Sequence, residues 1–219
     1  ADALDDPQRL GRILRAADRH GVLPIVVRKA SALARAQAGG ATDIVLQDYR
    51  ERLVGWIGQS MLLDRHARNI SGHLARAGVK AAIVKGPTFA NALYRDRSDR
   101  PFTDIDFLIP AEHLAAANRV MPALDFVRPQ KSWDNSDRDR EYKWLGRENR
   151  SVLIELHGDL VHYPMLRRQV SFGYDRLAAI EDGVRNRPAA LLMFAVVHAA
   201  CGHKFHQLSL LVDVLQAVR

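Results

Sequence analysis

Two aspartates, Asp104 and Asp106, stand two positions apart in the otherwise apolar segment PFTDIDFLIP, residues 101–110. Its alternation predicts a β-strand that ends at Pro110. Because side chains on a strand repeat every two residues, both carboxylates project from the same face. Two negative charges at this spacing repel each other unless a cation lies between them, and a divalent metal ion is the natural one. A solvated edge strand is the alternative interpretation.

A third carboxylate is expected from a neighbouring strand. Two metal ions about 3.5–4 Å apart, which clamp the attacking and leaving oxygens of a phosphoryl group, require about three converging carboxylates. Glu155 is the only acidic residue in the apolar run Val152–Leu156. It is therefore the candidate, with a water-facing side chain as the alternative.

Lys85 and Gly86 end a second β-rich segment, VKAAIVKG, which precedes a helical stretch, PTFANALY. A glycine at a strand-to-helix turn lets the backbone approach a phosphate, and the helix N-terminus offers free N–H groups. Lys85 adds a positive charge for a triphosphate. Arg100, just before the strand with the two aspartates, is a further candidate phosphate ligand, although a surface role suits a single arginine equally well.

These segments together resemble a known family. The stretch IVKGPTFANALYRDRSDRPFTDIDFLIP looks like the signature of the uncharacterised nucleotidyltransferase family within the DNA polymerase beta superfamily. The likeness continues at IELHGDL and, more faintly, at LLMFAVVHAACGHKFHQLSLLVDVLQ. It covers roughly residues 60–219 and is specific over residues 83–109.

The resemblance implies an enzyme that moves a nucleoside monophosphate from an NTP, such as ATP, to an acceptor hydroxyl and releases pyrophosphate. Asp104, Asp106 and Glu155 would be catalytic and would bind two Mg²⁺ ions, with Mn²⁺ as a substitute. Glu155 would also orient or deprotonate the acceptor hydroxyl. The candidate acceptors are RNA, a protein and a small molecule. A catalytically inactive nucleotide-sensing or partner-binding module with the same fold is the alternative.

The nucleotide-binding residues implied are Lys85, Gly86, Thr88, Arg100 and His157. The wider superfamily prefers Gly-Ser in the loop, whereas Pro87 follows the glycine here and cannot donate an N–H. Thr88 is expected to compensate. His157 shares a strand face with Glu155 because it follows two residues later.

The expected fold class is α+β, a nucleotidyltransferase-like mixed β-sheet flanked by helices. We divide the chain into a helical N-terminal segment (1–78), a nucleotidyltransferase core (79–160) and a C-terminal helical segment (161–219). In the first segment, Thr42 is predicted to N-cap a long helix that stops at Gly78. In the last, Pro188 is predicted to begin an apolar helix.

The net charge of +7, from 32 basic and 25 acidic residues, favours anionic partners such as nucleotides or RNA. A single cysteine excludes an internal disulfide and fits a reducing compartment. No apolar run is long enough to span a membrane. We therefore expect a cytoplasmic protein, and we read the sequence as a piece of a longer chain.

Several other side chains have two interpretations. His198, Cys201, His203 and His206 form either a zinc site or, as we expect, a group of structural histidines. His198 or Lys204 could instead reach the nucleotide. Asp213 is expected to cap a helix or pair with an arginine. The aromatic residues Trp133, Tyr142 and Trp144 are expected to pack in the core rather than stack on a base.

Overall fold

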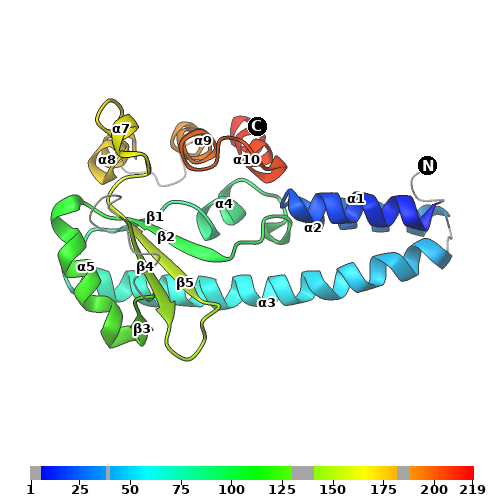
Figure 1. The fold of residues 1–219 in the computed structure, drawn as a ribbon, viewed down its shortest axis with the longest axis horizontal. Helices are drawn as coiled ribbons and strands as arrows, with labels where there is room; N and C mark the ends of the chain where they lie inside the picture. The colour runs from blue at the N-terminus through cyan, green and yellow to red at the C-terminus, as the bar shows by residue number, and fades with distance from the viewer. Residues whose placement is uncertain (1–5, 38–39, 130–140, 182–187) are drawn as a thin grey trace.

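The computed structural model describes residues 6–37, 40–129, 141–181 and 188–219 (Figure 1). It confirms the α+β class, with helices before, within and after a five-stranded mixed sheet. The helices are α1 (Pro7–Arg19), α2 (Leu23–Gln37), α3 (Gly40–Arg76), α4 (Pro87–Ala92), α5 (Leu114–Val120), α7 (Pro164–Arg167), α8 (Tyr174–Glu181), α9 (Pro188–Val197) and α10 (Leu208–Val218). Single 3₁₀ turns lie at Arg97–Asp99, Ala111–His113 and Met121–Leu124. No helix among these described residues is long and apolar enough to cross a membrane.

The first three helices form an arm that projects from the sheet body, and α3 continues from the arm beneath the sheet (Figure 1). The end of α3 is as predicted. Gly78 has a φ of +69°, and the N–H groups of Gly78 and Val79 donate to the carbonyls of Ala75 and Leu74, a Schellman motif. The predicted start is wrong, because Gly40 is already helical and Thr42 is a buried helix residue rather than the N-cap.

The strands are β1 (Ala82–Ile83), β2 (Asp104–Leu108), β3 (Phe126–Val127), β4 (Glu141–Gly146) and β5 (Leu153–His157), in the spatial order β1-β2-β5-β4-β3. Among the described strands, β2 and β5 run parallel and the other neighbouring pairs are antiparallel. β4 and β5 form an antiparallel hairpin, which the two β-rich runs of EYKWLGRENRSVLIELHG, residues 141–158, predict. The strand expected to reach Gly86 already ends at Ile83, and β3 was not predicted, since two residues are too few for a periodic signal.

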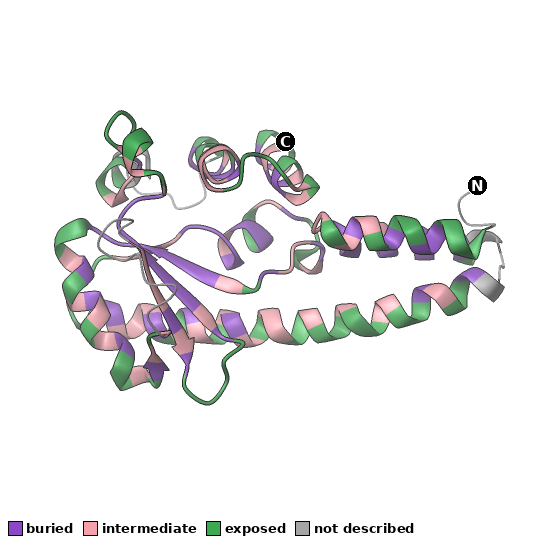
Figure 2. Ribbon diagram, viewed as in Figure 1, coloured by how far each residue is buried: buried purple, intermediate pink, exposed green. Residues whose placement is uncertain are grey.

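The two faces of the sheet differ in chemistry, as a period of two requires. Ile105 and Phe107 of β2, with Ile154 and Leu156 of β5, are fully buried against α3 and α5. The alternate residues point to the other face, which α9 and α10 cover (Figures 1 and 2). On that side Leu108 packs with residues of α9 and α10. The central strands are mostly buried, so charged side chains on the second face lie inside the protein.

The apolar helix predicted from Pro188 is present as α9, and α10 is a further helix of the C-terminal segment that was predicted to be helical. The chain between them makes a π-helical turn, His198–Gly202, that the sequence did not suggest. Residues 134–140, whose many charged side chains predict a loop, lie outside the described residues. The boundaries at 78 and 160 remain a proposal, since α3 shares a hydrophobic core with the sheet.

Candidate active site

A row of charged side chains crosses the second face of the sheet. Strand register places Asp106 opposite Glu155, and Glu155 opposite Lys143 on β4. Asp104 and His157 occupy the alternate positions of β2 and β5 that share this face. The predicted convergence of Asp104, Asp106 and Glu155 in one cavity is thus what the strands produce.

Asp106 is the most deeply buried of the three carboxylates, with 1% of its surface exposed. Its Oδ1 is 2.7 Å from Lys85 Nζ and 2.9 Å from His157 Nε2. Burial by itself raises the pKa of Asp106, but the Lys85 charge and the His157 hydrogen bond overcome it and hold that pKa below its usual range. Asp106 is therefore ionised inside the protein, with two cationic neighbours on one of its oxygens.

Asp104 lies in a different electrostatic environment. Burial, followed by repulsion from Asp106, raises the pKa of Asp104 to about 7 despite the opposing effect of Lys85. Two carboxylates on one strand face therefore resist being charged together. A divalent cation would relieve this repulsion.

Glu155 contacts both Lys143 on β4 and His157 on its own strand. Its Oε1 lies 2.6 Å from Lys143 Nζ and its Oε2 lies 3.3 Å from His157 Nε2. Burial opposes ionisation of Glu155, but the His157 hydrogen bond holds its pKa below the ordinary value. In turn, hydrogen bonds to Asp106 and Glu155 outweigh burial and raise the pKa of His157 to about 9. The predicted proximity of His157 to Glu155 is present, although His157 lies behind the two carboxylates and does not line the cavity.

Lys143 also contacts a fourth acid, which sequence reasoning did not single out. Lys143 Nζ is 2.8 Å from Glu141 Oε1, and His162 Nδ1 is 3.0 Å from Glu141 Oε2. Glu141 and Lys143 alternate on β4 in the same way that Asp104 and Asp106 alternate on β2. The same period-two argument applied to EYKW would have found them, whereas His162 follows β5 and carried no such signal.

Gly86 forms the turn between β1 and α4 with φ +47° and ψ −111°. A Cβ at this position would lie 3.2 Å from the carbonyl oxygen of Asp104 and 3.4 Å from the Phe102 ring. The turn thus needs glycine for its conformation and for its close approach to the carboxylate strand.

The predicted compensation by Thr88 is not seen. Its hydroxyl donates to the carbonyl of Ile83 at 2.7 Å, and its N–H donates to the carbonyl of Lys85 at 2.9 Å. Thr88 lines a separate surface pocket rather than the cavity with the carboxylates. Its side chain closes the turn, because a hydroxyl early in a helix bonds most easily to the local backbone.

We expect Gly86→Ala to lower the free energy of unfolding by about 1–3 kcal/mol, the usual cost of an unfavourable backbone conformation. Gly58→Ala is the matched control, since Gly58 lies within α3 and a Cβ there meets nothing within 4 Å. That control should gain about 0.5–1 kcal/mol from helix propensity. Urea unfolding of both variants measures the difference, and equal stabilities would contradict the assigned role of Gly86.

Arg100 lines the cavity but is held by a residue of α10. Its Nε lies 2.9 Å from Oδ1 of Asp213, and its Nη2 lies 2.9 Å from Oδ2. Its Nη1 donates to the Pro101 carbonyl at 2.9 Å. The expected pairing of Asp213 with an arginine is present. A phosphate role for Arg100 stays a prediction, and two of its five N–H groups make no hydrogen bond to a described residue.

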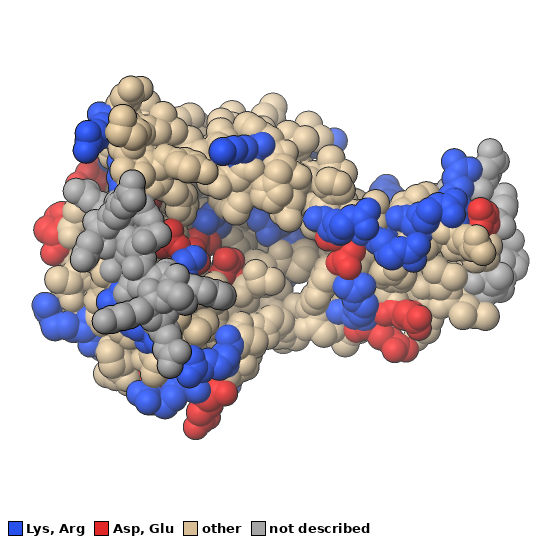
Figure 3. All heavy atoms as spheres, viewed as in Figure 1, with Lys and Arg blue, Asp and Glu red and all other residues tan. Residues whose placement is uncertain are grey.

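The cavity has a volume of about 860 Å³, within the range typical of small-molecule sites. Lys85, Gly86, Arg100, Asp104, Asp106 and Glu155, all predicted site residues, line it. The arm contributes Gly21, Trp56 and Gln59, and the C-terminal segment contributes, among others, Tyr163, His198, His203 and Gln207. Figure 3 shows acidic and basic atoms together in the hollow beneath the C-terminal helices. On the side of the arm that this view shows, acidic and basic side chains are interspersed.

The histidine rings near the C-terminus pack against one another and do not converge on a position for a metal ion. The His198 and His203 rings meet edge to face at 4.6 Å, and the His203 and His206 rings lie 5.4 Å apart. Burial, reinforced by the Lys85 charge, lowers the pKa of His198 to about 2, so its imidazole is neutral. Within the described part of the chain, the groups whose ligand atoms lie close enough together to hold a metal ion are Asp106–Glu155–His157 and Glu141–His157–His162, and neither includes these residues.

The predicted core aromatics pack as expected where they are described. Trp144 is buried, and its Nε1 donates to Asn118 Oδ1 at 3.0 Å, while Tyr142 packs at the edge of the sheet core. Trp133 lies outside the described residues. Trp56, on α3, lines the cavity, a position that no pattern in the sequence indicated.

A mixed sheet with carboxylates on adjacent strands, a glycine turn beside them and helices on both faces defines a nucleotidyltransferase-like protein. Comparison with known families agrees. The chain belongs to the family described as "Uncharacterised nucleotidyltransferase", whose profile matches residues 6–219. No curated protein and no solved structure matches the chain significantly.

Proposed function

We propose that the protein is a metal-dependent nucleotidyltransferase that moves a nucleoside monophosphate from an NTP to an acceptor hydroxyl, with release of pyrophosphate. The observation that carries the proposal is the register of two parallel strands. It sets Asp106 beside Glu155, with Asp104 on the same face, in one cavity.

The donor set fits Mg²⁺. The three carboxylates supply only oxygen ligands, which hard cations prefer. Among the described residues, the contacts of Asp106 with Lys85 and His157 both fall on Oδ1, which leaves Oδ2 for a metal ion. The raised pKa of Asp104 marks a site short of positive charge. Held by Asp104, Asp106 and Glu155, Mg²⁺ would supply positive charge to the phosphate oxygens as negative charge develops on them. Mn²⁺ would substitute for it.

The residues of the chain have separate tasks in this reaction. Lys85 and His157 hold Asp106 ionised and fix its orientation. Glu155 orients the acceptor hydroxyl and accepts its proton as the acceptor oxygen bonds to the α-phosphorus. The bond from that phosphorus to the bridging oxygen then breaks, and its electrons leave with pyrophosphate. Most of the catalytic effect would come from positioning and from stabilisation of charge.

The loop at Gly86 would bring backbone close to the triphosphate, with less donation than in the general scheme. Pro87 has no N–H, and the N–H of Thr88 is already bonded to Lys85. Lys85 and Arg100 would then contribute charge to phosphate binding. The acceptor is an RNA end, a protein hydroxyl or a small molecule.

The decisive experiment supplies each α-labelled NTP with Mg²⁺ and an acceptor panel of tRNA, protein and small hydroxyl compounds. We expect transfer of label by the natural protein and a loss of about 10³-fold in Asp104→Asn/Asp106→Asn, since metal ions contribute several kcal/mol to such reactions. Far-ultraviolet circular dichroism of the double variant checks that it is folded. Transfer that persists undiminished in the double variant, or transfer absent with every NTP and acceptor, would falsify the proposal.

The second candidate is an inactive nucleotide-sensing or partner-binding module. The ion pairs of Lys85 with Asp106 and of Lys143 with Glu155 favour it, because they neutralise two carboxylates without a metal ion. Calorimetry separates the two candidates: the module binds NTP and releases no pyrophosphate.

A further inference from the structure

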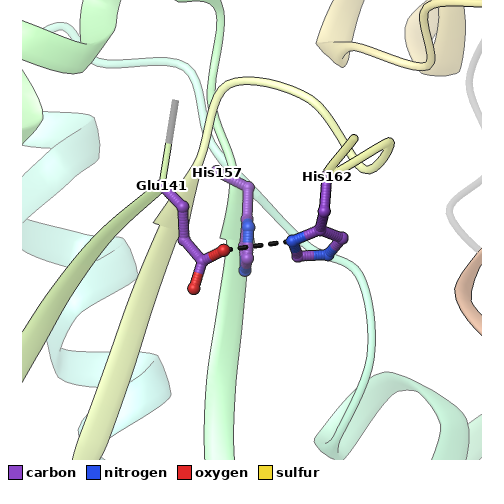
Figure 4. A group of neighbouring side chains, drawn as sticks. All are labelled: Glu141, His157 and His162. Atoms are coloured by element: carbon purple, nitrogen blue, oxygen red, sulfur yellow. Dashed lines mark hydrogen bonds and ion pairs between the residues drawn. The ribbon is translucent and has the colours of Figure 1, made fainter. Parts of the chain in front are cut away.

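A second group of metal-ligating side chains lies beside the carboxylates. One ligand atom from each of Glu141, His157 and His162 lies within 4.8 Å of the other two. Figure 4 shows the three side chains converging from β4, from β5 and from the segment that follows β5. We propose that these three residues bind a transition-metal ion such as Zn²⁺, at a site separate from the proposed Mg²⁺ site.

The main support is an unpartnered nitrogen on His157. This side chain is fully buried, and its Nδ1 has no hydrogen-bond partner among the described residues. A buried polar atom left in this way costs about 1–3 kcal/mol, with or without a proton. The ring's other nitrogen, Nε2, is the one that contacts Asp106 and Glu155. Nδ1 is therefore the atom available to a metal ion.

The contacts of Nε2 also prepare the ring for metal binding. A histidine that ligates a metal almost always donates its other ring N–H to a carboxylate or carbonyl, which fixes the tautomer and the ring orientation. His157 has this arrangement, with Asp106 Oδ1 at 2.9 Å from Nε2. In the neutral ring, the proton on Nε2 leaves the lone pair on Nδ1. Because the pKa of His157 is raised, a metal ion would have to displace a second proton from Nδ1 when it binds.

Glu141 can ligate a metal without giving up its lysine. Its Oε1 is paired with Lys143, whereas its Oε2 is the atom 3.0 Å from His162 Nδ1. Nitrogen and oxygen ligands at about 2.0–2.2 Å from a tetrahedral ion lie roughly 3.2–3.6 Å from each other. The Glu141 and His162 atoms thus need to move apart by only a few tenths of an ångström, while ligand atoms still 4.8 Å apart would have to approach by about 1 Å. His162 lies outside helix and strand with 30% of its side chain exposed, so it has room to adjust.

The choice of metal follows from the ligands. Two imidazoles and one carboxylate suit Zn²⁺ and related ions, whereas Mg²⁺ prefers oxygen ligands alone. Three protein ligands leave an open coordination position. Glu141 and His162 both line the cavity, so this position would face it and could take a phosphate or acceptor oxygen.

A simple hydrogen-bonded cluster is the competing explanation. It accounts for the contacts of Glu141 with His162 and Lys143, but it leaves the buried Nδ1 of His157 without a partner. A bound water molecule could fill that place, and a protein of this kind would bind no transition metal.

The experiment titrates metal-free protein with Co²⁺, a spectroscopic substitute for Zn²⁺, in excess Mg²⁺. We expect one Co²⁺ ion to bind per chain and to give a visible absorption band that indicates a low coordination number of the ion. Zn²⁺ should displace it stoichiometrically. Glu141→Gln and His162→Ala should each weaken Co²⁺ binding by about 100-fold or more, since even residues behind the ligands contribute 10–100-fold. Melting temperatures show that both variants are folded.

Two control variants locate the ion. His203→Ala removes a cavity histidine outside the proposed site, and Asp104→Asn removes a carboxylate assigned to Mg²⁺; both should keep Co²⁺ affinity. The proposal is overturned by absence of Co²⁺ binding, by binding unchanged in Glu141→Gln and His162→Ala, or by binding lost in either control. It does not depend on nucleotidyl transfer, because Asp104→Asn should lose transfer and retain Co²⁺.

Discussion

Arg100→Met is expected to lower the free energy of unfolding by about 3–5 kcal/mol, because it leaves the Asp213 carboxylate charged and buried without its main partner. Asp213 is 1% exposed and receives both Nε and Nη2 of Arg100. Tyr94 contributes one further hydrogen bond to Asp213, at 2.6 Å. A single hydroxyl cannot replace a bidentate guanidinium. Denaturant unfolding followed by circular dichroism measures the loss.

A double-mutant cycle separates a true pair from two independent effects. Asp213→Leu alone should also be strongly destabilised, since it leaves the Arg100 charge buried. The double variant Arg100→Met/Asp213→Leu should recover most of the loss, because an apolar pair can replace a buried ion pair at little cost. It should remain about 1–3 kcal/mol below the natural protein, as the Tyr94 hydroxyl loses its acceptor. Additive losses in the double variant would contradict a direct pairing.

This ion pair also shows which contacts sequence reasoning cannot reach. Arg100 and Asp213 are 113 positions apart, and no local pattern connects them. Asp213 was expected to cap a helix or meet an arginine, but the identity of the arginine depends on how α10 packs over the sheet. Arg100 lines the cavity, and its pairing with Asp213 there is likewise set by tertiary packing.

The strand-borne part of the site, by contrast, follows from periodicity. Asp104 and Asp106 share a face because a strand repeats every two residues, and the same rule places His157 with Glu155. The proximity of Asp106 and Glu155 required one further step, that the two strands carrying these acids are neighbours in the sheet. The structure has that pairing in register.

Prediction failed where short polar side chains choose between local and distant partners. Thr88 was expected to face a phosphate, yet its hydroxyl bonds to Ile83 in the same turn. Thr42 was expected to begin α3, but the helix already includes Gly40.

Glu141 and Lys143 were overlooked for a different reason. Their alternation was visible in the sequence, but acidic and basic residues on one strand look like an ordinary solvated face.

Glu155 is the carboxylate whose proposed task can be tested most directly. It lies between Lys143 on one oxygen and His157 on the other, and these contacts keep it ionised. An ionised carboxylate in the cavity can accept a proton from an acceptor hydroxyl. A neutral amide of the same shape cannot.

We therefore expect Glu155→Gln to lower kcat for nucleotidyl transfer by about 10²–10⁴-fold, the usual contribution of a general base. The KM for the NTP should change far less, since Asp104, Asp106 and Lys85 remain to bind the nucleotide. Glu148→Gln is the matched control, because Glu148 is an exposed acid in the connection leading to β5. Steady-state rates at saturating Mg²⁺ measure both variants.

If Glu155→Gln were as fast as Glu148→Gln, proton transfer to Glu155 would be excluded. If its loss of rate disappeared on adding Mn²⁺, metal binding would be the main task of this carboxylate, because a stronger-binding ion tolerates the loss of one oxygen ligand.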